Sequence, residues 1–192
     1  MSKLSFLSSF LAFSLLFGAC SAQKSDSKES NEIESTKNVL PKDQIILTDT
    51  TNNQYKLKKL KDGFKLEDSN AEILILDVFA TWCPPCQAEA SHLSSLQKKY
   101  PKSIKIIGIT IEDNIPNEKL EAFKKAHNAE YTLVNSAQNR VIINDLASML
   151  KLGSNFGIPL LAIYKDGKLI RFYQGAVEEE FIDSDIKRAL GK

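Results

Sequence analysis

Residues 79–86 read Phe-Ala-Thr-Trp-Cys-Pro-Pro-Cys and contain two of the three cysteines of this 192-residue chain. Two residues separate Cys83 from Cys86, a spacing that allows the pair to alternate between dithiol and disulfide. The third cysteine, Cys20, ends an apolar N-terminal run, so none is left over for a structural disulfide. The pair therefore predicts a site of thiol–disulfide exchange.

The segments on either side of the cysteine pair predict a strand that leads directly into a helix. Residues 73–79 are almost continuously aliphatic, which is expected of a strand covered on both faces in an α/β sheet. Residues 86–100 favour a helix, with Ala88, Leu93 and Leu96 available for an inner stripe. The cysteines then lie where this helix begins.

The rest of the chain continues the alternation of strands and helices. After the cysteine helix we expect a strand at 104–111, a helix at 117–127 and a strand at 131–134, which imply parallel βαβ topology. The leading and closing segments predict a hairpin at 44–48 and 54–57, a helix at 140–150, a hairpin at 160–165 and 169–174 around Asp166-Gly167, and a last helix at 178–190. The pattern predicts an α/β fold.

The N-terminus has the features of an export signal. Residues 4–17 form an apolar stretch that is too short for the roughly 20 residues of a membrane-spanning helix. Gly18 and Ala19 precede Cys20 and resemble a bacterial lipobox, although Phe17 departs from its usual leucine. We expect a lipoprotein signal peptide at 1–19, lipid attachment at Cys20, a flexible tether at 20–43 and one domain at 44–192. An ordinary cleaved signal or an uncleaved anchor is the alternative.

The composition argues against several other classes of protein. Lysine and arginine total 25 against 24 acidic residues and are scattered along the chain, so we expect no nucleic-acid partner. The two histidines, His92 and His127, fit no common Cys₂His₂ spacing and are expected on helix surfaces. We expect no metal and no cofactor.

Three motifs together resemble the membrane-tethered TlpA and ResA group. These are the Trp82–Cys86 segment, Glu89 three residues later, and Gly157-Ile158-Pro159 before the last hairpin. The resemblance covers about residues 44–190 and implies a thioredoxin fold, with a central mixed sheet flanked by helices, an N-terminal hairpin and an inserted βα element. One departure is Asp77, where this group often has asparagine and thioredoxins have aspartate.

The resemblance also implies a function. Its members are extracytoplasmic thioredoxin-like reductases, so we expect a membrane-anchored enzyme that reduces disulfides of exported proteins, with apocytochrome c as one candidate client. Such a reductase faces the periplasm or the cell exterior and needs recharging by a membrane electron donor of the CcdA or DsbD type. A thiol oxidase of the same fold is the nearest alternative. A metal-binding module, or a peptide-binding module without redox turnover, is the other.

The chemistry of exchange assigns a role to each site residue. Cys83 at the helix start is expected to be the exposed attacking thiolate, and Cys86, one turn inside, the buried resolving thiol. The two prolines lack N–H donors, so the Cys86 N–H is the nearest candidate to stabilise the Cys83 thiolate, and a poorly stabilised dithiol favours reduction of clients. Asp77 is expected to exchange a proton with Cys86, and Glu89 to tune the thiols or recognise a partner.

Three further residues are candidates for client binding. Trp82 is expected to shield and present the cysteines. Pro159 resembles the cis-proline that faces the cysteines in thioredoxin-like proteins, which makes Ile158, immediately before it, a candidate for contact with a bound peptide.

Overall fold

The computed structural model describes residues 41–153 and 155–192. The predicted signal peptide at 1–19, lipid attachment at Cys20 and most of the predicted tether at 20–43 lie outside these residues. Within the described part of the chain, no helix is both long and apolar enough to cross a membrane.

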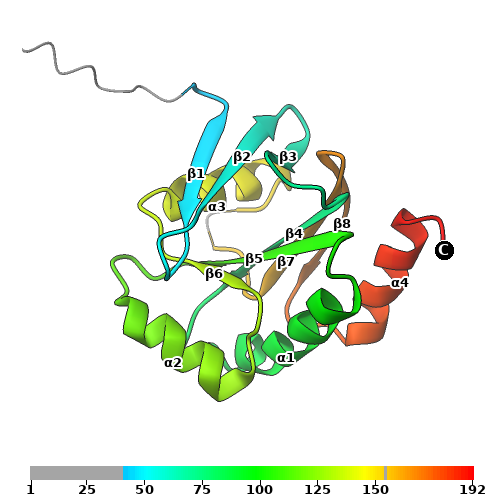
Figure 1. Cartoon of the computed structure of the whole chain (residues 1–192). Helices are drawn as coiled ribbons and strands as arrows, with labels where there is room; N and C mark the ends of the chain where they lie inside the picture. The colour runs from blue at the N-terminus through cyan, green and yellow to red at the C-terminus, as the bar shows by residue number, and fades with distance from the viewer. Residues whose placement is uncertain (1–40, 154) are drawn as a thin grey trace, which may run out of the picture. The chain divides into compact units, whose positions relative to one another are not determined.

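The centre of the domain is a five-stranded mixed sheet in the order β6-β5-β4-β7-β8 (Figure 1). β4 pairs in parallel with β5 and antiparallel with β7, β5 pairs in parallel with β6, and β7 and β8 form an antiparallel hairpin. The strands span Ile73–Phe79 (β4), Ile104–Thr110 (β5), Thr132–Val134 (β6), Leu160–Lys165 (β7) and Lys168–Gln174 (β8). The predicted parallel βαβ order and closing hairpin are confirmed.

Helices cover both faces of this sheet, as predicted for an α/β fold. Side chains of α1 (Pro84–Lys99), α2 (Asn117–His127) and α4 (Glu179–Ala189) share one apolar cluster with one face of the sheet. Side chains of α3 (Asn139–Met149) share a second cluster with the opposite face. Figure 1 shows α1, α2 and α4 on one side and α3 on the other. The central strand β4 is consequently buried along its whole length.

A second sheet precedes the central one and has one strand more than predicted. The expected hairpin is present as β1 (Gln44–Thr48) and β2 (Gln54–Leu60), and the short strand β3 (Gly63–Leu66) pairs with β2 in antiparallel fashion. A Cβ on Gly63 would lie 2.3 Å from the Gly167 carbonyl oxygen, so only glycine permits this close approach to the β7–β8 turn. The apolar side chains of β1, β2 and β3 complete the second cluster.

The arrangement of β4 and α1 positions the cysteine pair. Alternate residues of β4 face opposite clusters, and Ile75 and Phe79 point to the cluster that contains α1. Asp77 lies between them in the sequence and therefore points to the same side. The strand ends at Phe79, and α1 begins at Pro84. This short connection holds Cys83 and Cys86 over the end of the central strand.

Candidate redox site

Cys83 and Cys86 form a disulfide at the N-terminus of α1. Cys83 is the N-cap residue, with Pro84 and Pro85 in the first turn, and the Cys86 backbone N–H donates to the Cys83 sulfur at 3.3 Å. The predicted donor is therefore in place. The prolines add no other N–H group to this turn, so the helix end offers the sulfur less stabilisation than an ordinary first turn.

The burial of the two cysteines differs from the prediction. Cys83 was expected to be exposed, but both cysteines are only 3% exposed in the disulfide. The Cys83 sulfur is bonded to Cys86 on one side and lies 3.9 Å from the Ile158 carbonyl oxygen on the other. The loop before Pro159 covers the Cys83 sulfur on the side away from Cys86, and this contact explains the burial of Cys83.

The residues expected to bind clients surround the disulfide. The Ile158–Pro159 peptide bond is cis, and Ile158 packs against both apolar clusters. Trp82 has 63% of its surface exposed directly beside Cys83. The structure thus brings Trp82, Ile158 and Pro159 to the cysteine pair, with the indole open to solvent.

Asp77 is a buried carboxyl group in the middle of the core. It is 2% exposed, its Oδ2 accepts a hydrogen bond of 2.9 Å from the Tyr131 hydroxyl, and its Oδ1 has no partner among the described residues. Burial raises the pKa of Asp77 to about 7, and the bond from Tyr131 offsets part of this rise. The carboxyl therefore changes charge near neutral pH.

Glu89 is equally buried, on the face of α1 that also carries Cys86. Its side chain is 2% exposed, and Oε1 accepts a hydrogen bond of 3.1 Å from the Val177 backbone N–H. Burial, followed by the nearby charge of Asp77, raises the pKa of Glu89 to about 8. Ala88, which was expected on this inner face, is exposed instead, and Ala90 is buried.

The structure adds two residues that the sequence analysis missed. Glu112 holds the loop before the cysteines, because its carboxylate accepts hydrogen bonds from the Thr81 backbone N–H at 2.7 Å and the Thr81 hydroxyl at 3.0 Å. Glu112 follows a buried parallel strand that lies beside the strand ending at the cysteines, and this position could have identified it from the sequence. Tyr131 had no such signal, since its contact with Asp77 joins residues 54 apart in the chain.

The two histidines lie on helices, His92 on α1 and His127 on α2, and both side chains are half buried. The His92 Nδ1 is buried without a hydrogen-bond partner among the described residues. Across residues 41–153 and 155–192, no three His, Cys, Asp or Glu side chains are grouped so that they could hold a metal ion.

Comparison with known proteins places this geometry in a family. The model of the AhpC/TSA family matches residues 47–172, which include both cysteines, both buried carboxyl groups and Pro159. The chain belongs to the AhpC/TSA family. The predicted membership of a thioredoxin-like family is thereby confirmed.

Individual relatives carry related names. Thiol:disulfide interchange protein DsbE of Vibrio cholerae is 37% identical over 73 residues, which are 36% of this chain and 38% of the relative. A DsbE of Tatumella citrea is 36% identical over 64 residues, or 31% and 33% of the two chains. The matches thus span little more than a third of these relatives. Thiol-disulfide oxidoreductase ResA of Bacillus thuringiensis is 23% identical over 65% of this chain and 67% of its own.

Solved structures confirm the thioredoxin-like fold. A secreted Mycobacterium tuberculosis disulfide oxidoreductase, described as homologous to E. coli DsbE, is 18% identical, with a TM-score of 0.54 over 76% of this chain and 96% of its own. StoA from Bacillus subtilis is 15% identical, with the same TM-score over 74% and 95%. The predicted fold class is therefore correct.

Proposed function

We propose that this protein is a membrane-anchored, extracytoplasmic thiol–disulfide oxidoreductase that reduces disulfides of exported proteins. The observation that carries the proposal is the Cys83–Cys86 disulfide at a helix N-terminus, in a core that also buries the carboxyl groups of Asp77 and Glu89. Such an arrangement joins an electron-carrying pair to groups that exchange protons near neutral pH. The names of the relatives support the same class of reaction.

The reaction begins with the reduced pair. The Cys83 thiolate attacks one sulfur of a client disulfide, which forms a Cys83–client mixed disulfide and releases the other client sulfur as a thiolate. Cys86 then gives its proton to the Asp77 carboxylate and attacks Cys83, which closes the Cys83–Cys86 disulfide and frees the second client thiolate. Both client thiolates take up protons. Two electrons have passed from the enzyme to the client.

The assignment of Cys83 as attacker is supported by its N-cap position, although it is buried in the disulfide. Its sulfur faces the Ile158 carbonyl group, where an extended client segment would pair with the backbone before Pro159. The exposed indole of Trp82 would lie against the client. A client therefore approaches from the side of Trp82, Ile158 and Pro159.

The reductive direction rests on the electrostatics of the first turn of α1. A strongly oxidising pair owes its potential to a well-stabilised reduced form, in which the thiolate receives several donors. Here the Cys86 N–H is the donor from the first turn, since the two prolines supply none. An ionised Asp77 close to the pair would further disfavour a thiolate.

The proposed location follows from the lipobox-like Cys20 and the apolar segment before it. A reductant outside the cytoplasm must be recharged, so a membrane dithiol donor of the CcdA or DsbD type is the proposed partner, and exported disulfide proteins such as apocytochrome c are the proposed clients. Radiolabelled palmitate should enter the wild-type chain in a bacterial host and be absent from Cys20→Ser. Equal incorporation would contradict lipid attachment at this residue.

The function is tested by replacing the pair. The full chain, reduced beforehand, is expected to reduce a disulfide-bonded test protein with one equivalent of product per Cys83–Cys86 dithiol. Cys83→Ser/Cys86→Ser should fold and have no such activity. A double variant that retains the biological activity of the wild type would instead support the peptide-binding module. Metal analysis of the reduced wild type tests the metal-binding alternative.

A further inference from the structure

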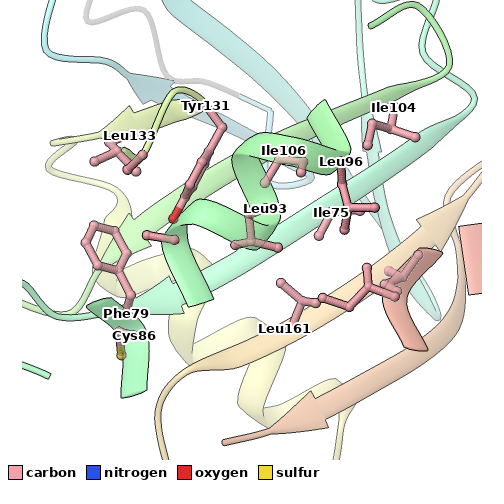
Figure 2. Packing of buried hydrophobic residues seen from close by; sticks show 14 of the residues in the cluster. Ile75, Phe79, Cys86, Leu93, Leu96, Ile104, Ile106, Tyr131, Leu133 and Leu161 are labelled. Carbon is pink, nitrogen blue, oxygen red and sulfur yellow. The ribbon is translucent and has the colours of Figure 1, made fainter. Parts of the chain in front are cut away.

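Tyr131 reaches Asp77 across a strand that separates them. β5 lies between β4 and β6, and its Gly108 is the register partner of Asp77 on β4 and of Leu133 on β6. Tyr131 precedes β6, yet its hydroxyl donates to the Asp77 carboxylate. The side chain therefore passes over β5 at Gly108. Figure 2 shows the Tyr131 ring beside Leu133, with its hydroxyl directed into the core.

Gly108 makes this passage possible because it has no side chain. A Cβ at this position would lie 2.6 Å from Leu133 Cδ2 and 3.0 Å from Tyr131 Cε2. Those distances are too short for carbon atoms in contact, so any larger residue would displace Leu133, Tyr131 or both. The glycine is needed here for space.

The bond from Tyr131 singles out one of two buried carboxyl groups. Asp77 receives the tyrosine hydroxyl at 2.9 Å, and Glu89 receives the Val177 N–H at 3.1 Å. The second oxygen of each carboxyl is buried without a partner among the described residues. A donor favours the charged form of its acceptor, and two carboxylates that repel one another do not both ionise easily.

The elements around Asp77 and Glu89 bring few other titratable groups near the two carboxyls. α1 contributes Glu89, Cys83 and Cys86, with the two cysteines joined as a disulfide. β5 and β7 place Gly108 and Leu161 opposite Asp77, and neither residue titrates. The charge of Asp77 also acts on Glu89, and both carboxyls act on Tyr131. The Tyr131 hydroxyl is a side-chain donor to Asp77 that Glu89 lacks, since the donor to Glu89 is a backbone N–H.

We propose that Tyr131 is a positioning residue, seated in the space left by Gly108, that makes Asp77 ionise before Glu89. The consequence for catalysis rests on the proposed function: Asp77 is then the carboxylate that accepts the Cys86 proton, while Glu89 remains neutral beside it. Without the Tyr131 hydroxyl, Asp77 would lose its donor while Glu89 would keep the Val177 N–H. Glu89 would then become the first to ionise.

The test follows the two carboxyl groups directly in the oxidised full chain. Carboxyl ¹³C resonances are titrated by NMR, with Asp77→Asn and Glu89→Gln used for assignment. In Tyr131→Phe, the midpoint of Asp77 should rise by about one pH unit or more, because a hydrogen bond to its charged form is lost. The midpoint of Glu89 should fall, so that the order of the two titrations reverses.

The matched control is Tyr164→Phe. The Tyr164 hydroxyl is buried, like that of Tyr131, but it has no partner among the described residues. Its side chain belongs to the other apolar cluster. This variant should leave both midpoints where they are in the wild type. If Tyr131→Phe moves Asp77 no further than Tyr164→Phe does, the proposal is wrong.

A second experiment leaves the buried Tyr131 hydroxyl in place. Biosynthetic replacement of the five tyrosines by 3-fluorotyrosine makes each phenol a stronger donor without shortening the side chain. The midpoint of Asp77 should then fall, and an unchanged midpoint would overturn the proposal. Neither experiment requires turnover, so a protein without exchange activity would refute the proposed function and leave this test intact.

Discussion

Replacing Asp77 with asparagine tests the high proton affinity of the buried carboxyl. Burial raises its pKa from 3.8 to about 7. Because the folded pKa lies above the unfolded one, the folded state binds an additional proton between these values. The stability that this proton contributes is fully present below about pH 4 and is lost as the pH rises through 7.

The size of the effect follows from the two pKa values. Each pH unit between 3.8 and about 7 corresponds to about 1.4 kcal/mol, so ionisation of Asp77 costs the wild type about 4 kcal/mol of stability at pH 8. Asparagine does not ionise, and its side-chain oxygen still accepts the bond from Tyr131. We therefore expect Asp77→Asn to resemble the wild type near pH 4 and to be more stable by up to about 4 kcal/mol at pH 8.

The assay is guanidinium unfolding of the oxidised full chain at several pH values from 4 to 8. Asp183→Asn is the control of opposite sign: its carboxyl is also buried, but it pairs with Lys99 at 2.9 Å and Lys187 at 2.7 Å, which lower its pKa against the effect of burial. This control should be less stable than the wild type by a nearly constant amount from pH 4 to 8, because the stability gained from its lowered pKa is lost only below about pH 4. A difference between Asp77→Asn and the wild type that is constant from pH 4 to 8 would refute the reasoning.

Three further predictions concern the remaining site residues. Cys86→Ser should accumulate a mixed disulfide between Cys83 and a client, seen by mass spectrometry without reductant; greater trapping by Cys83→Ser would reverse the two roles. Trp82→Ala should raise KM for a disulfide-bonded protein several-fold while stability changes by less than about 0.5 kcal/mol, because the indole is 63% exposed; an unchanged KM would exclude client contact. In Asp77→Asn, Glu89 should titrate at lower pH than in the wild type, since the Asp77 charge helps to raise its pKa; a carboxyl ¹³C titration with an unmoved midpoint would contradict the coupling.

The main elements were predictable because each has a strong local pattern. The continuous aliphatic run of β4 and the Asp166-Gly167 turn, where both residues have positive φ, identify themselves without reference to the rest of the chain. The strand β3 was missed because it has only four residues and depends on its pairing with β2. Its apolar side chains can be recognised as core residues only when the second cluster is known.

The site was less predictable than the fold because its chemistry depends on contacts between distant segments. The spacing of Asp77, Cys83, Cys86 and Glu89 identified the residues, but burial of Glu89 against Val177 involves a separation of 88 residues. The covering of Cys83 by Ile158 spans 75 residues. Local patterns contain no information on such pairs, so the exposure expected for Cys83 was wrong.

The reduction potential of the Cys83–Cys86 couple tests the central claim most directly. The full chain is equilibrated in thiol–disulfide buffers of defined potential, and the fraction of dithiol is measured after acid quenching and alkylation. A two-electron transition near about −270 mV, as in thioredoxin, is the result expected of a dedicated reductant. A value near about −120 mV would contradict the reductive direction and indicate a thiol oxidase.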